Sequence, residues 1–432
     1  MTIKGFFSGK TAKQLIERSQ VYGGSGGDPC TKCGLHKGVI TSKMRPSGEG
    51  ELGVLVVGEA PGKTEDEQGV QFIGEAGQLW QEYLNEYGID IHRDFKLTNA
   101  VNCRPPKNRT PSASEIQCCR GRVRAVMEEF NPKQIWLVGE AAIKSFYGMR
   151  FSECGVGRWH RLCIPDKQTN AWVVPMYHPS FALRANNDKN KLSCFERDLR
   201  FAVGCLGLER PVIADPVPMV DIITEYGQVV HYLKWLLNRA HNEKFLMAFD
   251  YECSNLKPFY GEVQYIWSCA ISLGVDNATA FPVSYTGHFT RQQEATITHL
   301  LKLIMEHPNI GKIAHNLQFE DLWSRGVLGA KMAGWHWCTM NAAHVLDNRR
   351  DFCGLKFQSY INFGIEGYEK ESKPYMRKMH KGTELNMLDT MPLDNLLLYN
   401  GLDALLTMWL FNKQRPIFGR KGEPRGISLG RV

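Results

Sequence analysis

Apolar and polar positions along this chain predict strands and helices in alternation. In the first half, short apolar runs bounded by turn-forming residues predict β-strands over 53–57, 135–138 and 172–176. Between these runs, apolar residues recur at helical spacing, as they do from Leu79 to Tyr87. Because strands that alternate with helices form a parallel sheet covered by helices, the first half predicts an α/β domain.

The second half shows the same alternation. A strand is predicted over 244–249, and two further apolar runs, 263–272 and 278–284, predict a hairpin. A pattern with helical period follows over 291–306. These elements predict a second α/β domain.

A connector is predicted near 205–222, where the sequence carries three prolines and little periodicity. A chain of 432 residues, 43% of them hydrophobic, is long and apolar enough for two cores. We therefore expect a first domain over 1–209, a linker over 210–221 and a second domain over 222–432.

The charge balance is mildly basic, with a formal net charge of +7. An excess of this size fits a polyanion such as DNA as a partner, without establishing one. The longest apolar runs are too short to span a bilayer, so no membrane association is expected.

Four cysteines in the first part of the chain form a candidate metal shell. Cys30 and Cys33 make a CxxC pair, and Cys103 and Cys119 could supply two further thiolates. The total of 13 cysteines is odd and no signal-like apolar run precedes them, so a disulfide framework is not expected. A zinc site, an iron–sulfur site and unrelated buried thiols remain open on this pattern, and Cys118 makes one ligand ambiguous.

An acidic turn lies between the two pairs of cysteines. The apolar strand that begins at Val54 runs into the glycine-bounded segment Gly58-Glu-Ala-Pro-Gly62, which carries Glu59. A carboxylate in a turn that follows a strand, enclosed by a metal shell, suggests a scaffolded active site.

Together these segments closely resemble the family 4 uracil-DNA glycosylases, over roughly residues 28–200. The matching segments, in family order, are Cys30-x-x-Cys33, Gly58–Gly62, Glu65-Asp66, Gln71–Gly74, Thr98–Arg109, Cys119 and His178–Arg184. The resemblance implies a three-layer α/β glycosylase domain with a parallel sheet. It also implies a [4Fe–4S] cluster on Cys30, Cys33, Cys103 and Cys119, since the family spacing selects Cys119 over Cys118.

The same resemblance assigns roles to the candidate pocket. Phe72 would stack on the flipped base, and Asn99 would read the uracil edge through its amide. Glu59 would orient a water or stabilise the charge of the transition state, and His178 would donate to the uracil O2. Arg184 would enter or brace the duplex.

A second set of carboxylates is spaced for a metal site. Asp250-Tyr-Glu252 ends the strand predicted over 244–249, and carboxylates two apart on a strand point to the same face. Such a pair repels itself unless a cation lies between, so it is a metal-site candidate. Tyr399 and Asp403 are four apart in the helical run 393–411 and share one helical face.

With Ala314-His-Asn-Leu-Gln-Phe-Glu320, this ordered set resembles the tyrosine-containing branch of the DEDD-type 3′–5′ exonucleases, over roughly 240–412. The resemblance implies a ribonuclease H-like domain with a mixed sheet and Mg²⁺ or Mn²⁺ as cofactor. The implied metal ligands are Asp250, Glu252, Glu320 and Asp403, and Tyr399 would orient the attacking water. The family usually has Asp where Glu320 stands; Asp321 faces elsewhere on a helix, so Glu320 is selected.

The two resemblances predict a DNA repair or replication enzyme. It would excise uracil by base flipping and glycosidic hydrolysis, and its second domain would be a metal-dependent 3′–5′ exonuclease. Expected partners are single-stranded and duplex DNA and a separately encoded DNA polymerase, in the cytoplasm of a prokaryotic or phage-infected cell. The alternative is a DNA-binding replisome module, or part of a split phage DNA polymerase, in which one or both sites are inactive.

Overall fold

In the computed structural model of the protein, the described residues are 30, 32–184, 188–259, 264–376 and 386–419. They divide into two compact units, with the boundary between Ile213 and Ala214. Among these residues no helix is both long and apolar enough to cross a membrane.

The first unit is built on a five-stranded sheet with the order β2-β1-β3-β5-β4. Its strands are β1 (Val54–Gly58), β2 (Phe95–Asn99), β3 (Gln134–Val138), β4 (Ile164–Asp166) and β5 (Ala171–Met176). Four strands run parallel, as predicted, whereas the short edge strand β4 is antiparallel to β5. All five residues of β1 are buried because helices cover both faces of the sheet.

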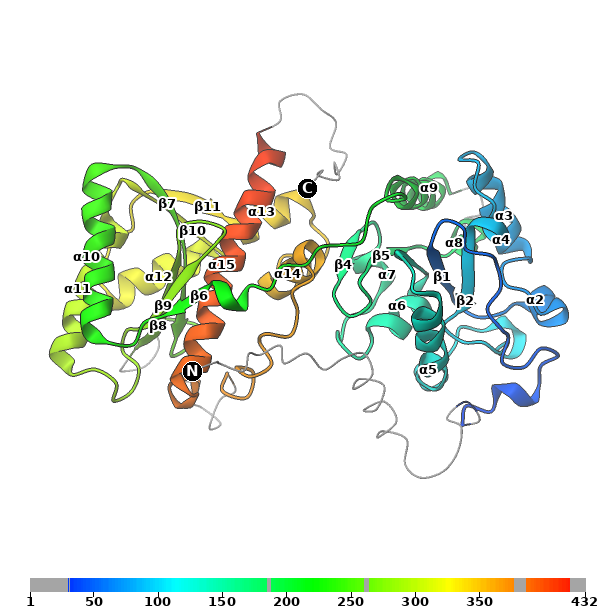
Figure 1. Cartoon of the computed structure of the whole chain (residues 1–432), viewed down its shortest axis with the longest axis horizontal. Coiled ribbons are helices and arrows are strands. Elements are labelled where there is room, and N and C mark those ends of the chain that lie inside the picture. The colour runs from blue at the N-terminus through cyan, green and yellow to red at the C-terminus, as the bar shows by residue number, and fades with distance from the viewer. Residues whose placement is uncertain (1–29, 31, 185–187, 260–263, 377–385, 420–432) are drawn as a thin grey trace. The chain divides into compact units, whose positions relative to one another are not determined.

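Two helical layers enclose this sheet (Figure 1). On one face, Val54 and Val56 join a core that includes Trp80, Phe195 and Leu199. The helices of that face include α3 (Glu75–Asn85), α8 (Pro179–Leu183) and α9 (Lys189–Gly204), and the opposite face is covered by α5 (Ala113–Phe130) and α6 (Glu140–Tyr147). Among its described residues, the other α-helices of the unit are α2 (Lys63–Gln68), α4 (Ile91–Asp94) and α7 (Val156–Trp159). The predicted three-layer α/β arrangement is confirmed.

The second unit contains a six-stranded sheet with the order β11-β10-β7-β8-β9-β6. Its strands are β6 (Val220–Ile222), β7 (Phe245–Cys253), β8 (Ile266–Ser272), β9 (Ala278–Pro282), β10 (Ile310–Ala314) and β11 (Trp335–Cys338). Strands β7, β8 and β9 form an antiparallel meander, and β10 and β11 continue the sheet parallel to β7. This confirms the ribonuclease H-like mixed sheet expected from the resemblance.

Two sequence-based boundaries differ from the structure in this unit. Strand β7 continues past residue 249, so Asp250 and Glu252 lie within it. The last two residues of the predicted linker, 220 and 221, belong to β6, which pairs with β9. The predicted hairpin is present as β8 and β9, and residue 263 of its first predicted strand lies outside the described residues.

Different sets of helices cover the two faces of this sheet. One face is covered by α10 (Tyr226–Asn242), α11 (Arg291–Glu306) and α12 (Leu317–Val327), which share a core with Met247 and Phe249 of β7. The other face is crossed by α15 (Leu393–Phe418), flanked by α13 (Thr339–Leu346) and α14 (Leu355–Phe363) (Figure 1). Helix α15 is buried on nearly all sides over Leu396–Met408, as expected of a helix whose apolar residues are not confined to one face.

Candidate active sites

The first candidate site lies where the parallel strands of the first unit end. Glu59 directly follows β1, Asn99 is the last residue of β2, and His178 follows β5. The strand register pairs Gly58 with Asn99, and the Val101 N–H donates to the Glu59 carbonyl at 3.1 Å. The carboxyl ends of parallel strands are where open α/β sheets bind ligands, so the fold brings these three side chains to one edge.

Phe72 approaches this edge from the loop between α2 and α3. Its φ is +55°, a left-handed conformation that costs a bulky residue free energy and is concentrated at functional sites. Its ring lies 6.4 Å from the His178 ring, centroid to centroid, and 5.2 Å from Trp80. The surrounding structure therefore holds Phe72 in a costly conformation with its ring beside His178.

Gly58 is a site residue that sequence reasoning quoted only as part of a motif. A Cβ at this position would lie 2.4 Å from Asn99 Oδ1 and 2.7 Å from Phe72 Cζ. Only glycine allows the strand, the amide and the ring to approach this closely. The signal was present in the Gly58–Gly62 segment, but the contacts that require glycine exist only after β1 and β2 pair.

The Glu65 carboxylate fixes the loops that carry these residues. It accepts hydrogen bonds from the Gly62 N–H at 3.1 Å and from the Gly74 N–H at 2.8 Å. One side chain therefore ties the turn that follows Glu59 to the loop that carries Phe72.

His178 is held neutral with a defined tautomer. Burial, followed by the nearby Arg184 guanidinium, lowers the pKa of His178 to about 4. Its Nδ1 accepts the Ser180 N–H at 3.1 Å, and a backbone amide can only donate. The neutral ring therefore carries its proton on Nε2, which makes that atom a hydrogen-bond donor.

Glu59 is half-buried near two charged groups. Burial raises its pKa, Arg184 opposes this effect, and Glu140 adds to it. Arg184 is an exposed residue at the end of α8. It lies near both Glu59 and His178.

The four predicted thiol ligands gather from three segments. Burial, helped by the neighbouring Cys30, Cys33 and Cys103, raises the pKa of Cys119 to about 12. The Lys43 N–H donates to Cys103 Sγ at 3.2 Å, and the Asn102 backbone amide lies against Cys119. Amide donors to sulfur are typical surroundings of anionic iron–sulfur clusters.

Cys118 and Cys119 differ in their surroundings. Cys119 is buried and interacts electrostatically with all three other predicted ligands. Cys118 is only partly buried, and its cysteine neighbours are Cys33 and Cys30.

The spacing of the thiols bears on the kind of metal. In the described part of the chain, the one group with three ligand atoms mutually within 4.8 Å is Asp250, Glu252 and Asp403. A tetrahedral zinc with bonds of about 2.3 Å would bring its sulfurs to roughly 3.8 Å from one another. Among the described residues, no three of the four thiol sulfurs form such a group.

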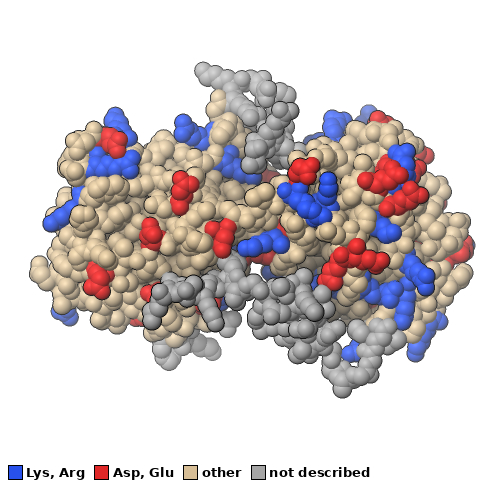
Figure 2. Space-filling model, viewed as in Figure 1, with Lys and Arg blue, Asp and Glu red and all other residues tan. Residues whose placement is uncertain are grey.

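A basic loop borders Cys33. Arg104 and Lys107 line a hollow of about 550 Å³ beside this thiol. Arg109, in the same loop, makes a bidentate ion pair with Glu115 at 2.6 and 2.9 Å. On the face in view, basic and acidic side chains are otherwise interspersed over both units (Figure 2).

The second candidate site is a cluster of carboxylates between β7 and α15. Asp250 and Glu252 project from the face of β7 that α15 covers, and Asp403 meets them from that helix. Burial raises the pKa of Asp250 and of Glu252 well above the usual range, and neighbouring carboxylates raise both further. Such crowding favours a divalent cation, which makes these residues a fitting metal site.

Asn400 orients one of these carboxylates, and the sequence analysis did not single it out. Its amide donates to Asp250 Oδ2 at 2.7 Å, while its Oδ1 accepts from the Ser268 hydroxyl at 2.9 Å. The signal was its position next to Tyr399, but its contact reaches 150 residues back along the chain.

Glu320 and Asp321 have separate surroundings. Glu320 is buried on α12; burial raises its pKa well above the usual range, and Asp250 and Glu252 add to this effect. Its Oε2 is buried and has no hydrogen-bond partner among the described residues. Asp321 is instead ion-paired with Arg325 at 2.7 Å. An orphaned buried oxygen beside two carboxylates fits a cation ligand.

Tyr399 lies one helical turn before Asp403 and is buried beside the cluster. Burial raises its pKa well above the usual range, and Asp403 and Glu252 raise it further. Two residues that the sequence analysis did not identify, Lys356 and Tyr368, also contact Asp403.

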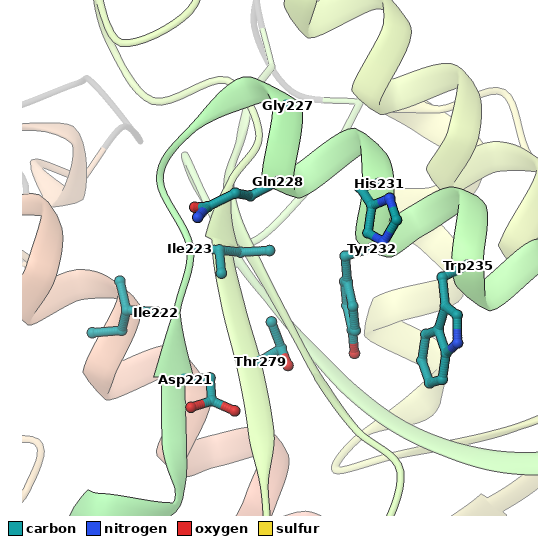
Figure 3. A pocket seen from close by; sticks show the side chains of 9 residues that line it. All are labelled: Asp221, Ile222, Ile223, Gly227, Gln228, His231, Tyr232, Trp235 and Thr279. Atoms are coloured by element: carbon teal, nitrogen blue, oxygen red, sulfur yellow. The ribbon is translucent and has the colours of Figure 1, made fainter.

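A separate hollow of about 750 Å³ opens between β6, β9 and α10 (Figure 3). It is lined by Asp221, Ile222, Ile223, Gly227, Gln228, His231, Tyr232, Trp235 and Thr279. None of the predicted site residues lies there, and its side chains form no group of metal or nucleophilic ligands.

Comparison with known proteins matches both units separately. Residues 46–200 match the uracil DNA glycosylase superfamily, and residues 225–417 match the 3′–5′ exonuclease family. A type-4 uracil-DNA glycosylase of Pyrobaculum aerophilum is 37% identical over 188 residues, which cover 42% of this chain and 91% of that protein. One from Thermotoga maritima is 36% identical over 165 residues, covering 38% of this chain and 81% of that protein.

A third relative spans both units. A DNA polymerase of Bacillus phage SP01 is 23% identical over 406 residues, which cover 89% of this chain. The chain spans 42% of the length of that polymerase.

Proposed function

The chain belongs, through its first unit, to the type-4 uracil-DNA glycosylase family, and from this premise we propose that it excises uracil from DNA. The observation that carries the proposal is the convergence of Phe72, Asn99 and His178 at one sheet edge. The exonuclease-family match of the second unit extends the proposal to release of nucleotides from 3′ ends.

The geometry supports a division of labour in uracil excision. A flipped uracil would stack on Phe72, and the Asn99 amide would pair with its polar edge. The Nε2–H of neutral His178 would donate to the oxygen that gains charge as the base leaves. Glu59 would stabilise the positive charge that develops on the sugar, and Arg184, with the basic loop residues Arg104 and Lys107, would contact phosphates.

The experiment that tests this function is an incubation of uracil-containing DNA with the full chain in EDTA. Single-stranded and U:G duplex substrates should both yield abasic sites, because the glycosidic step relies on protein groups. The absence of abasic product from either substrate over a range of salt concentrations would refute the glycosylase proposal.

For the cofactor of this unit, we propose a [4Fe–4S] cluster on Cys30, Cys33, Cys103 and Cys119. The gathering of the four thiols and the amide donors to Cys103 and Cys119 support this choice. When bound, the cluster would supply architecture, since Cys103 lies four residues past Asn99 and anchors that segment.

Single substitutions should distinguish the proposed cluster ligand Cys119 from its neighbour Cys118. Cys119→Ser should lose the iron and the broad visible absorption of the anaerobically purified protein. Cys118→Ser should keep both, since Cys118 is only partly buried and lacks the contact with Cys103. Stoichiometric zinc with no iron in the wild type, or an equal loss in both variants, would contradict the assignment.

The pH dependence of the rate of uracil excision should follow the protonation of the Glu59 carboxylate. Its raised pKa means that the carboxylate becomes protonated at a higher pH than usual, so the rate should fall as pH drops through a value above 4.5. His178 should remain neutral down to about pH 4 and should not contribute to this limb.

Rate profiles of two variants check the assignment. In Glu59→Gln the rate should be lower but flat through this acid range, whereas His178→Gln should be slower and keep the limb. A limb that persists in Glu59→Gln and vanishes in His178→Gln would assign the titration to the histidine instead.

In the second unit, Asp250, Glu252 and Asp403 would hold Mg²⁺ or Mn²⁺, with Glu320 completing the set. Bound metal would supply a polarised water and stabilise phosphoryl oxygens. The chain itself would contribute Tyr399 to orient the water and Asn400 to fix Asp250. The occurrence of both units in one phage polymerase supports a place beside a DNA polymerase during replication.

A further inference from the structure

A lysine occupies the carboxylate cluster of the second unit. Lys356 projects from α14, and its Nζ donates to both carboxylate oxygens of Asp403, to Oδ2 at 2.5 Å. The Tyr368 hydroxyl donates to Oδ1 of the same carboxylate at 2.7 Å. Both oxygens that Asp403 could offer to a cation therefore already have donors.

The ammonium group also lies between two aromatic rings. Its Nζ is 4.3 Å from the ring centroid of Tyr368 and 4.3 Å from that of Tyr399. At this distance a cation is attracted to the face of a ring. The Asp403 carboxylate and the two rings thus form a binding site for one positive charge. The same carboxylate is a ligand of the proposed metal site.

The charge balance of the cluster explains why a cation is needed there. Asp250, Glu252 and Asp403 have oxygens mutually within 4.8 Å, and Glu320 is buried next to them. The favourable interaction of Lys356 with Asp250 and with Glu252 opposes the effect of burial on these two groups. The single positive charge of Lys356 neutralises part of the negative charge of these carboxylates. Another cation can neutralise the remainder.

We propose that Lys356 is an internal counter-ion that stabilises the carboxylate cluster in the absence of metal and leaves Asp403 when a divalent cation binds. This inference rests on the proposed metal site of the second unit. A divalent cation and the ammonium compete for the same two oxygens, and like charges at hydrogen-bond distance from one carboxylate repel each other strongly. The apparent metal affinity is lowered by the free energy of moving the lysine away.

Removal of the ammonium should therefore strengthen metal binding. We expect the full-length Lys356→Met protein to bind Mn²⁺ on the order of tenfold more tightly than the wild type, as when the competing state of a two-state equilibrium is removed. In EDTA the variant should melt at a lower temperature, because its carboxylates lack a counter-ion. Its gain in melting temperature on adding Mn²⁺ should exceed that of the wild type.

The test is a titration of each protein with Mn²⁺, in which the electron paramagnetic resonance signal of the free ion measures binding. Lys234→Met is the matched control, because Lys234 is exposed on α10, on the opposite face of the sheet. It makes the same change in charge and should bind Mn²⁺ as the wild type does. Equal or weaker binding by Lys356→Met overturns the exchange, because it shows that the Lys356 ammonium does not compete with the metal for Asp403.

A second measurement uses the wild type alone, so it tests the proposal even if Lys356→Met fails to fold. With a limiting amount of an amine-acetylating reagent, Lys356 should be modified several-fold faster in Mg²⁺ than in EDTA. Mass spectrometry measures the extent of acetylation. An unchanged rate for a protein shown to bind Mn²⁺ contradicts displacement. If neither the wild type nor Lys356→Met binds Mn²⁺, the proposed metal site itself is wrong; binding by the variant alone retains both the site and the role of Lys356.

Discussion

Asp250→Ala is expected to abolish metal-dependent release of nucleotides from a 3′ end, with a fall on the order of a thousandfold, the upper range for losing one placed catalytic group. The substitution removes the carboxylate that Asn400 orients toward the cluster, and with it one of three ligand atoms mutually within 4.8 Å. Uracil excision should be unchanged, because its proposed residues all belong to the first unit.

The measurement is a gel assay of 3′-terminal degradation with and without Mg²⁺, alongside a uracil-excision assay of the same preparation. Asp276→Ala, which changes an exposed carboxylate in the loop between β8 and β9, is the matched control and should keep both activities. Nuclease activity that survives Asp250→Ala and remains sensitive to EDTA would show that another part of the chain holds the metal.

The Glu320 position allows a test within the same assay. Glu320→Asp restores the residue usual for the family and shortens the side chain by one methylene. If the wild type is inactive and Glu320→Asp is active, the unit had lost its chemistry through that methylene. Asp321→Asn should not affect activity, because Asp321 is engaged by Arg325. If none of these proteins releases nucleotides, the alternative of a DNA-binding module replaces the exonuclease proposal.

Asn99→Ala is expected to lower the rate of uracil excision by roughly a hundredfold or more, about 2.7 kcal/mol of transition-state stabilisation. The amide is buried at the end of β2, where Gly58 leaves room for it beside Phe72. Removing it deletes the donors and the acceptor that would recognise the pyrimidine edge, while the alanine leaves the strand pairing intact.

Single-turnover kinetics on a U:G duplex measure this effect. Asn85→Ala, which makes the same change at the exposed end of α3, should keep the wild-type rate. A rate for Asn99→Ala within a few-fold of the wild type would remove Asn99 from the role of base reader and leave its buried position as a packing feature.

The sequence by itself determined the elements whose pattern is local. The helix predicted over 291–306 forms α11 with the same bounds, because a capping Thr290 and a regular apolar period are contained in one segment. The strand predicted over 53–57 forms β1 as Val54–Gly58. The shared face of Asp250 and Glu252 follows from the two-residue period of a strand, wherever that strand lies.

The assignment of chemistry to these elements came from the order of motifs. The resemblance named the candidate residues, and the structure brings Glu59, Asn99 and His178 to one sheet edge and Asp250, Glu252 and Asp403 to one cluster. Periodicity alone could not do this, because a lone asparagine or phenylalanine has the same local pattern in a core as in a pocket.

Only the tertiary structure decided which side chains complete each site. Lys356 and Tyr368 reach Asp403 across 47 and 35 positions of the chain, and Asn400 reaches Asp250 across 150. The left-handed backbone of Phe72 and the requirement for glycine at Gly58 likewise depend on neighbours from other elements. Contacts of this kind leave no local pattern, because they are set by how strands pair and helices pack rather than by the propensity of any one segment.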